Sequence, residues 1–147
     1  MLWMKSPFRY TATAKNVRDW LPMWMTTSSA IWDIIRHGRT GETYNVGGNC
    51  ELENLALVEM ICDGIDRKLG RPAGRSRELI TFVKDRPGHD LRYAIDAGKI
   101  KNDLGWTPIT KIDAGIAATI DWYLENDAWV SRVKSGAYRE WIARQYE

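Results

Sequence analysis

The sequence has few of the residues that build metal centres and disulfide frameworks. Its 147 residues include two cysteines, Cys50 and Cys62, and two histidines, His37 and His89. The cysteine spacing matches no zinc motif, and two cysteines are too few for a disulfide scaffold. The sequence therefore predicts no metal site and a reducing compartment, which makes the cytoplasm the expected location.

Long apolar runs and an excess of one charge are also missing. No run approaches the roughly 18 apolar residues of a membrane span, and residues 1–4 are too short for the apolar core of a signal peptide. The 21 basic and 19 acidic residues interleave and give a net charge of +2. A nucleic-acid-binding domain shows a clustered basic stripe instead. Neither a membrane nor a nucleic acid is expected as a partner, and the basic stretch 67–77 is interpreted as a solvated loop.

Common catalytic motifs are absent from the sequence. It contains no H-E-x-x-H and no G-x-S-x-G. Glycines gather between Gly38 and Gly48, but they follow a predicted helix and flank a predicted strand. A phosphate-binding glycine loop comes after a strand and opens a helix. These motifs therefore identify no catalytic residue and no cofactor-binding residue in this chain.

Helical periodicity dominates from residue 30 onward. The first helix is expected to be capped by Ser28 or Ser29 and to stop at Gly38. The second begins with Asn54 as N-cap and ends at Gly70. Apolar patterns predict further helices over 96–105 and 113–126 and a stripe at Tyr138, Trp141, Ile142 and Tyr146, a pattern that favours core packing. Short strands are predicted over 43–46 and 79–83.

This order of elements predicts the fold class. It is typical of an α/β (α+β-like) fragment, mostly helical with a few short strands. Two short strands make a poor sheet without a partner. Residues 1–29 show no sustained period and are interpreted as an irregular segment, whereas residues 30–147 are expected to form one domain.

The loop 84–90 is the strongest candidate for a binding site. An arginine can grip a phosphate with two parallel N–H donors, and Pro87-Gly88 forces a turn that could bring backbone N–H groups to a ligand. The alternative is a surface turn with unpaired charges, and the residues leave the two readings nearly even.

Several motifs resemble those of nucleotide-sugar dehydratases. The relevant stretches are Asp85-Arg86-Pro87-Gly88-His89-Asp90 with Arg92-Tyr93, the segments 15–21 and 41–48, and Leu104-Gly105-Trp106-Thr107-Pro108. The tail, Trp129 with Ser135-Gly136-Ala137-Tyr138 and Trp141, resembles dTDP-glucose 4,6-dehydratases in particular. The resemblance runs in order from about residue 15 to residue 147. It identifies the chain as similar to the carboxy-terminal portion of that family of NAD-dependent, extended short-chain dehydrogenases/reductases.

The resemblance implies a substrate site without the catalytic machinery. Family members are homodimers that oxidise the sugar at C4 with NAD, remove water across C5 and C6, and return the hydride to C6. Their amino-terminal Rossmann domain carries the NAD loop, the Y-x-x-x-K pair and the Asp/Glu pair. None of these is present here, and Tyr10 and Lys15 are one residue too far apart. The chain is expected to bind a dTDP-sugar, to be inactive alone, and to have the missing amino-terminal half as a possible partner.

The resemblance also assigns the site residues. Arg18 would grip the pyrophosphate, Asn54 would contact the substrate, and the loop would line the nucleotide end through Asp85, Arg86, Pro87, Gly88 and His89. Asn54 has the alternative role of an N-cap, and Arg18 that of a surface pair with Asp19. Two rival interpretations stay open: a remnant or interaction module that binds no nucleotide sugar, and a piece of a related epimerase or decarboxylase, which the tail disfavours.

Two stretches depart from the family pattern. The family reads Tyr-Gly-x-Gly where this chain has residues 10–14, and Tyr-Val-x-Asp-His where it has residues 22–26. Codons exist for both stretches that encode the family peptides when read in a displaced frame. We therefore interpret both as frame-shifted or mis-sequenced segments that flank an in-frame stretch, residues 15–21.

Overall fold

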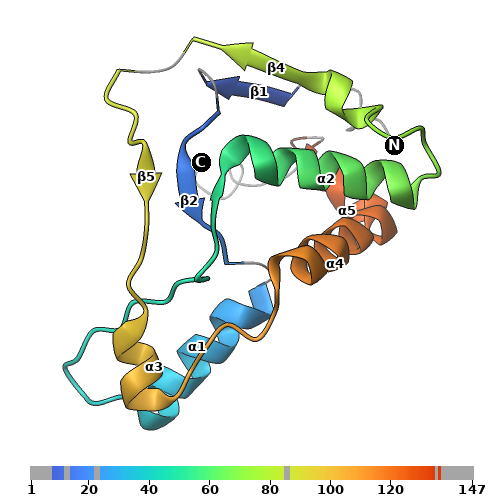
Figure 1. Ribbon diagram of the computed structural model, residues 1–147. Helices are drawn as coiled ribbons and strands as arrows, with labels where there is room; N and C mark the ends of the chain where they lie inside the picture. Colours follow the sequence, from blue (N-terminus) through green and yellow to red (C-terminus); the bar gives the residue numbers. More distant parts are fainter. Residues whose placement is uncertain (1–7, 12–13, 22–23, 85–86, 135, 137–147) are drawn as a thin grey trace, which may run out of the picture.

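The computed structural model describes residues 8–11, 14–21, 24–84, 87–134 and 136 (Figure 1). This part of the chain contains five helices and five short strands. The strands are β1 (Phe8–Thr11), β2 (Val17–Asp19), β3 (Glu51–Glu53), β4 (Ile80–Val83) and β5 (Arg92–Tyr93). The helices are α1 (Trp24–His37), α2 (Asn54–Lys68), α3 (Gly98–Leu104), α4 (Ile112–Glu125) and α5 (Asp127–Lys134), with a 3-10 turn, η2 (Ser76–Leu79), before β4.

The strands form two small sheets. β1 pairs in parallel with β4. β2 is the centre of the other sheet, antiparallel to β3 and parallel to β5. Val17 is therefore opposite Glu53 on one side and Arg92 on the other. Strands this short depend on side-chain packing and on the helices around them.

The buried side chains form two clusters. Ala30 of α1, Ala97, Ile100 of α3 and Trp106 form the first, and the Trp106 indole N–H donates to Ser29 Oγ at 3.0 Å. In the second, Ile65 of α2 and Ile120 of α4 are surrounded by the apolar residues of the same two helix faces. These are the faces that the i, i+3, i+4 pattern predicts. Burying an isoleucine contributes about 1.5–3 kcal/mol, so the two clusters hold the helices in place.

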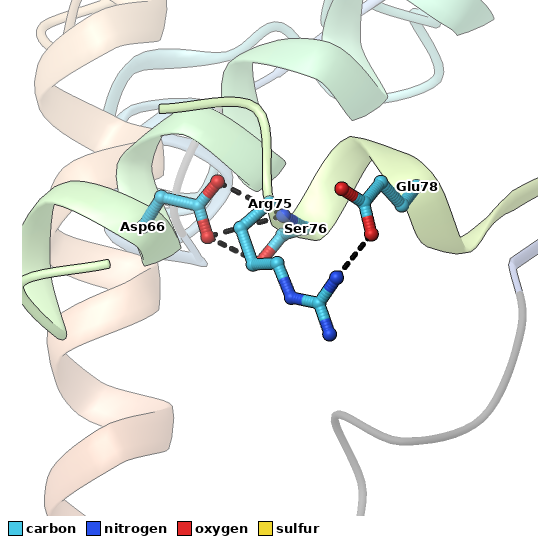
Figure 2. Close-up of polar contacts among 4 residues, drawn as sticks. All are labelled: Asp66, Arg75, Ser76 and Glu78. Atoms are coloured by element: carbon cyan, nitrogen blue, oxygen red, sulfur yellow. Dashed lines mark hydrogen bonds and ion pairs between the residues drawn. The ribbon is translucent and has the colours of Figure 1, made fainter. Parts of the chain in front are cut away.

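A buried carboxylate fixes the chain that leaves α2 (Figure 2). Asp66 is 2% exposed and accepts hydrogen bonds from the Ser76 N–H at 2.9 Å and the Ser76 hydroxyl at 2.6 Å. Arg77 adds ion pairs to Asp63 at 2.5 Å and to Glu59 at 3.2 Å. Most of the stretch 67–77 is exposed, as its charges suggest, although it begins in the last turn of α2 and its final turn is fastened to that helix.

The structure confirms the expected fold class and corrects several details. The periodic helices are present, and the second predicted strand is β4. The segment 43–46 forms no strand, because the described residues place no strand beside it. Ser28 and Ser29 lie inside α1, where Ser29 donates to the Thr26 carbonyl, instead of capping it. No helix in the described ranges is long and apolar enough to cross a membrane.

Candidate functional site

The candidate site is built on β2, which is hydrogen-bonded to two segments that are distant from it in the sequence. The Asn16 side chain donates to the Asp90 carbonyl at 3.0 Å, and the Val17 N–H donates to the Leu91 carbonyl at 2.8 Å. On the other side, Asp19 accepts from the N–H groups of Gly48 at 3.0 Å and Cys50 at 2.9 Å. The strand thereby joins the segment after the loop 84–90 to the segment before α2.

Arg18 projects from the middle of this strand onto the carboxyl side of the predicted loop. Its guanidinium lies 3.2 Å from His89 Nε2 and donates to the Asp90 carbonyl at 3.1 Å and to the Val17 carbonyl at 2.7 Å. The guanidinium carbon also lies 4.1 Å from the centre of the Tyr93 ring, a cation–π distance. These contacts fix the orientation of the guanidinium before any ligand arrives.

The structure excludes the interpretation of Arg18 and Asp19 as a surface ion pair. The Asp19 carboxylate is used by two backbone N–H groups, and Arg18 binds across the sheet to residues 89–93. Within the described ranges, the partners of Arg18 are carbonyls, an imidazole and a ring, and no carboxylate neutralises it. A partly buried guanidinium without a carboxylate partner attracts an anion.

Asn54 has a different place from the one that its sequence context suggests. The N-cap of α2 is Glu53, whose side chain makes no capping bond, and Asn54 is the first residue of the helix. The Asn54 N–H donates to the Asn16 carbonyl at 2.9 Å, which sets Asn54 beside β2. Its buried Oδ1 has no hydrogen-bond partner among the described residues. An unsatisfied buried amide costs about 1–3 kcal/mol, so the capping role does not account for this asparagine.

The remaining predicted residues belong to the loop before β5. Pro87 and Gly88 are exposed at a turn, and Gly88 has a φ of +69°, a left-handed conformation that glycine adopts without strain. Asp85 and Arg86 lie outside the described residues. Of the seven predicted residues, the structure brings Arg18 and His89 into contact and places Asn54 at the start of α2, directly after β3.

At the edge of the sheet, Arg92 is paired with a carboxylate, whereas Arg18 is paired with none among the described residues. Arg92 binds Glu51 with two hydrogen bonds of 2.6 and 2.7 Å between β5 and β3. The hydrogen bond from Arg92 lowers the pKa of the Glu51 carboxyl, and the same bond raises the pKa of Arg92. The ion pair stabilises the folded state at pH values above the ordinary pKa of a glutamate side chain. This stabilisation is lost as the pH falls through the lowered pKa of Glu51.

Asn16, Asp90 and Tyr93 complete the site but were not among the predicted site residues. The Tyr93 hydroxyl donates to the Asp90 carboxylate, while the Asp90 carbonyl accepts from both Asn16 and Arg18. Asp90 and Tyr93 were visible in sequence as parts of the D-R-P-G-H-D-x-R-Y stretch. Asn16 had no such signal, because its role depends on a pairing between positions far apart in the chain.

The glycines near β3 do not form a dinucleotide site. A Cβ on Gly48 would lie 1.9 Å from the Trp20 carbonyl oxygen, so this glycine is required for the close approach of two backbones. The segment leads into a strand instead of opening a helix, so its N–H groups do not form a helix terminus for a pyrophosphate. The glycine segment before β3 therefore does not fit NAD.

Comparisons with known proteins agree with the motifs. A family model described as GDP-mannose 4,6 dehydratase matches residues 4–119. The dTDP-glucose 4,6-dehydratase of Salmonella typhimurium is 50% identical over 132 residues, which are 90% of this chain and 36% of the relative.

Solved structures give the same result for the fold. The dTDP-glucose 4,6-dehydratase of Bacillus anthracis, solved in complex with NAD, aligns with a TM-score of 0.71 and 37% identity over 87% of this chain and 38% of that one. The enzyme of the same name from Streptomyces venezuelae was solved with NAD and a second ligand. It aligns with a TM-score of 0.73 and 34% identity over 87% of this chain and 37% of that one. The chain thus spans little more than a third of the relatives that it matches. With the motifs at 15–21, 41–48 and 85–93, these matches show that the chain belongs to the GDP-mannose 4,6 dehydratase family and is similar to its dTDP-glucose 4,6-dehydratases.

Proposed function

We propose that this chain is the carboxy-terminal, substrate-binding part of a dTDP-glucose 4,6-dehydratase, a cytoplasmic lyase of nucleotide-sugar metabolism. It binds the dTDP-sugar and does not catalyse the reaction by itself. The observation that carries the proposal is the Arg18 guanidinium, held by His89, Asp90 and Tyr93 and paired with no described carboxylate.

The chemistry of this arrangement suits a diphosphate. A guanidinium offers five N–H donors in a planar fork, and two of them can bind two phosphate oxygens in parallel. His89 and the Asp90 carbonyl hold one edge of Arg18, so little rotamer entropy is lost when the anion arrives. Arg86 and the exposed turn at Pro87 and Gly88 line the nucleotide end in this proposal, and the Asn54 amide contacts the substrate.

In this proposal, the redox steps are carried out by the amino-terminal half of the enzyme. NAD supplies hydride acceptance and return when it is bound, and the present chain contributes positioning of the nucleotide sugar. The missing amino-terminal half is the partner that this proposal requires, and the whole enzyme is a homodimer, as the family resemblance implies.

Binding of dTDP tests the proposal. At a concentration of about 100 times Kd, a ligand that binds only the folded state stabilises it by about 2.7 kcal/mol. This corresponds to a rise in Tm of roughly 5–10 °C for a chain of this size. We expect dTDP to give such a shift in a thermal melt and thymidine to give much less, because thymidine has no diphosphate. No shift with either ligand would favour the remnant that binds no nucleotide sugar.

The purified chain should have no dehydratase activity with dTDP-glucose and NAD. Hydride transfer requires the nicotinamide to be held against C4, and the glycine segment before β3 does not fit NAD. A spectrophotometric assay for the 4-keto-6-deoxy sugar measures this directly. Product above the no-protein blank would show that the chain is more than a binding portion.

A further inference from the structure

An apolar groove lies on the side of α2 that faces α4 and α5. It has a volume of about 590 Å³. Leu57 and Ile61 of α2 form one wall, Ile116 and Tyr123 of α4 form the second, and Trp129 and Val133 of α5 form the third. The contact between Ile65 and Ile120 joins α2 to α4 beneath it. The groove is separate from the Arg18 site, whose residues do not line it.

The groove leaves large apolar side chains open to solvent. Tyr123 is 39% exposed, Trp129 is 42% exposed and Val133 is 49% exposed. Single exposed apolar residues are ordinary, but a continuous apolar groove on three helices is typical of a surface that another segment covers. Among the described residues that line it, Lys134 is the only charged one and most of the others are apolar, so a mainly apolar occupant fits the groove.

We propose that the carboxy-terminal segment of this same chain, residues 137–147, binds in the groove as a helix and that Trp141 is its anchor. The end of α5 lies beside the groove. α5 ends at Lys134, which itself lines the groove. Gly136 has a φ of +76°, the left-handed conformation that ends helices and reverses the chain. Gly136 therefore follows the rim of the groove closely in a conformation that favours a reversal of the chain.

The sequence of residues 137–147 has an amphipathic pattern. Its large apolar residues have helical spacing and would share one face of a helix: Tyr138, Trp141, Ile142 and Tyr146. Arg139 and Arg144 would lie outside that face. Eleven residues in a helix extend about 16 Å, roughly three turns, which matches the two- to four-turn helices that form the walls. A tryptophan or tyrosine buries about 150–250 Å² in such a contact.

Covalent connection favours the carboxy-terminal segment over other occupants. A second copy of the chain, or a separate amino-terminal half, would have to bind from solution. A segment joined to the rim by a short connection acts at an effective concentration in the millimolar range. It occupies the groove unless a competitor binds more tightly than that concentration allows. The tail is therefore the occupant that the connectivity favours.

Hydrogen exchange on the full-length chain tests the proposal. Trp141→Ala should increase the exchange of amides in α4 and α5 by about tenfold or more, because removing an interface anchor by truncation costs at least about 1.4 kcal/mol. The matched control is Arg139→Ala, a change outside the apolar face, which should leave the exchange of α4 and α5 as in the wild type. Unchanged exchange in Trp141→Ala, with an unchanged far-ultraviolet spectrum, would overturn the proposal.

A photo-crosslink keeps the test valid if Trp141→Ala unfolds. Benzoylphenylalanine at position 123 replaces one aromatic ring by another on the α4 wall. Irradiation of the full-length chain should link this position to a peptide within 137–147 of the same molecule, as mass spectrometry identifies. A link to another segment, a link only between two copies, or no link would each exclude the tail as the occupant.

Discussion

Replacing Arg18 by alanine is expected to weaken dTDP binding by roughly 10- to 150-fold. Charge-assisted hydrogen bonds contribute about 1.5–3 kcal/mol, and each 1.4 kcal/mol is a factor of ten in affinity. Arg18 makes no bond to a described carboxylate, so its removal should not expose a buried counter-charge. Isothermal titration calorimetry with dTDP measures the loss.

Three further variants define what Arg18 contributes. Arg18→Lys should recover part of the affinity, because lysine keeps the charge without the planar fork. Arg86→Ala should show a loss of the same order, as the family resemblance implies. Arg67→Ala is the control, since Arg67 is exposed at the end of α2, away from β2. Equal dTDP affinity in Arg18→Ala and the wild type would remove Arg18 from the site.

Gly48→Ala is expected to destabilise the chain by about 1–3 kcal/mol or more, the range for overpacking a tight contact. The added methyl group would lie 1.9 Å from the Trp20 carbonyl oxygen and 3.2 Å from the Asp19 carboxylate. Because the Trp20 N–H binds the Cys50 carbonyl, the backbone cannot move apart without breaking that bond and the bonds to Asp19. Urea unfolding followed by circular dichroism gives the change in free energy.

Gly98→Ala provides a matched control for this substitution. Its Cβ would approach only the flexible carboxylate of Asp96 at 2.9 Å, and position 98 lies in the first turn of α3, where alanine is a better helix former than glycine. Its unfolding midpoint should stay near that of the wild type. A Gly48→Ala chain as stable as Gly98→Ala would show that the segments around Trp20 and Gly48 separate easily.

The helices could be predicted from the sequence, but the sheet around Arg18 could not. α2 and α4 repeat apolar residues over three or more turns, and the faces so defined carry Ile65 and Ile120 into the core. β2, β3 and β5 are two or three residues long, too short for a period of two to be visible. The segment 43–46 has strand composition but no strand beside it in the described part of the chain, so composition alone misassigned it.

The candidate site, like the fold, could be predicted only in part from the sequence. Family motifs singled out Arg18 and His89 separately, and the structure places them 3.2 Å apart, whereas their roles in binding stay predictions. The roles of Asn16 and Asp90 follow from register, which the sequence does not encode locally. The error at Asn54 arose because asparagine favours N-caps on average, whereas the pairing of β2 with β3 places Glu53 at that position.

The position of β2 between β3 and β5 has a kinetic consequence. Arg18 lies beside Tyr93 in the register, yet the two are separated by about half of the chain. The entropy of closing so long a loop must be lost before the contacts compensate for it, and such non-local pairing slows folding. During synthesis, α1 and α2 can form as soon as they emerge from the ribosome. The contacts of Arg18 with β5 cannot form until β5 has been synthesised. A nascent chain that stops before residue 93 therefore has α1 and α2 but no anion site.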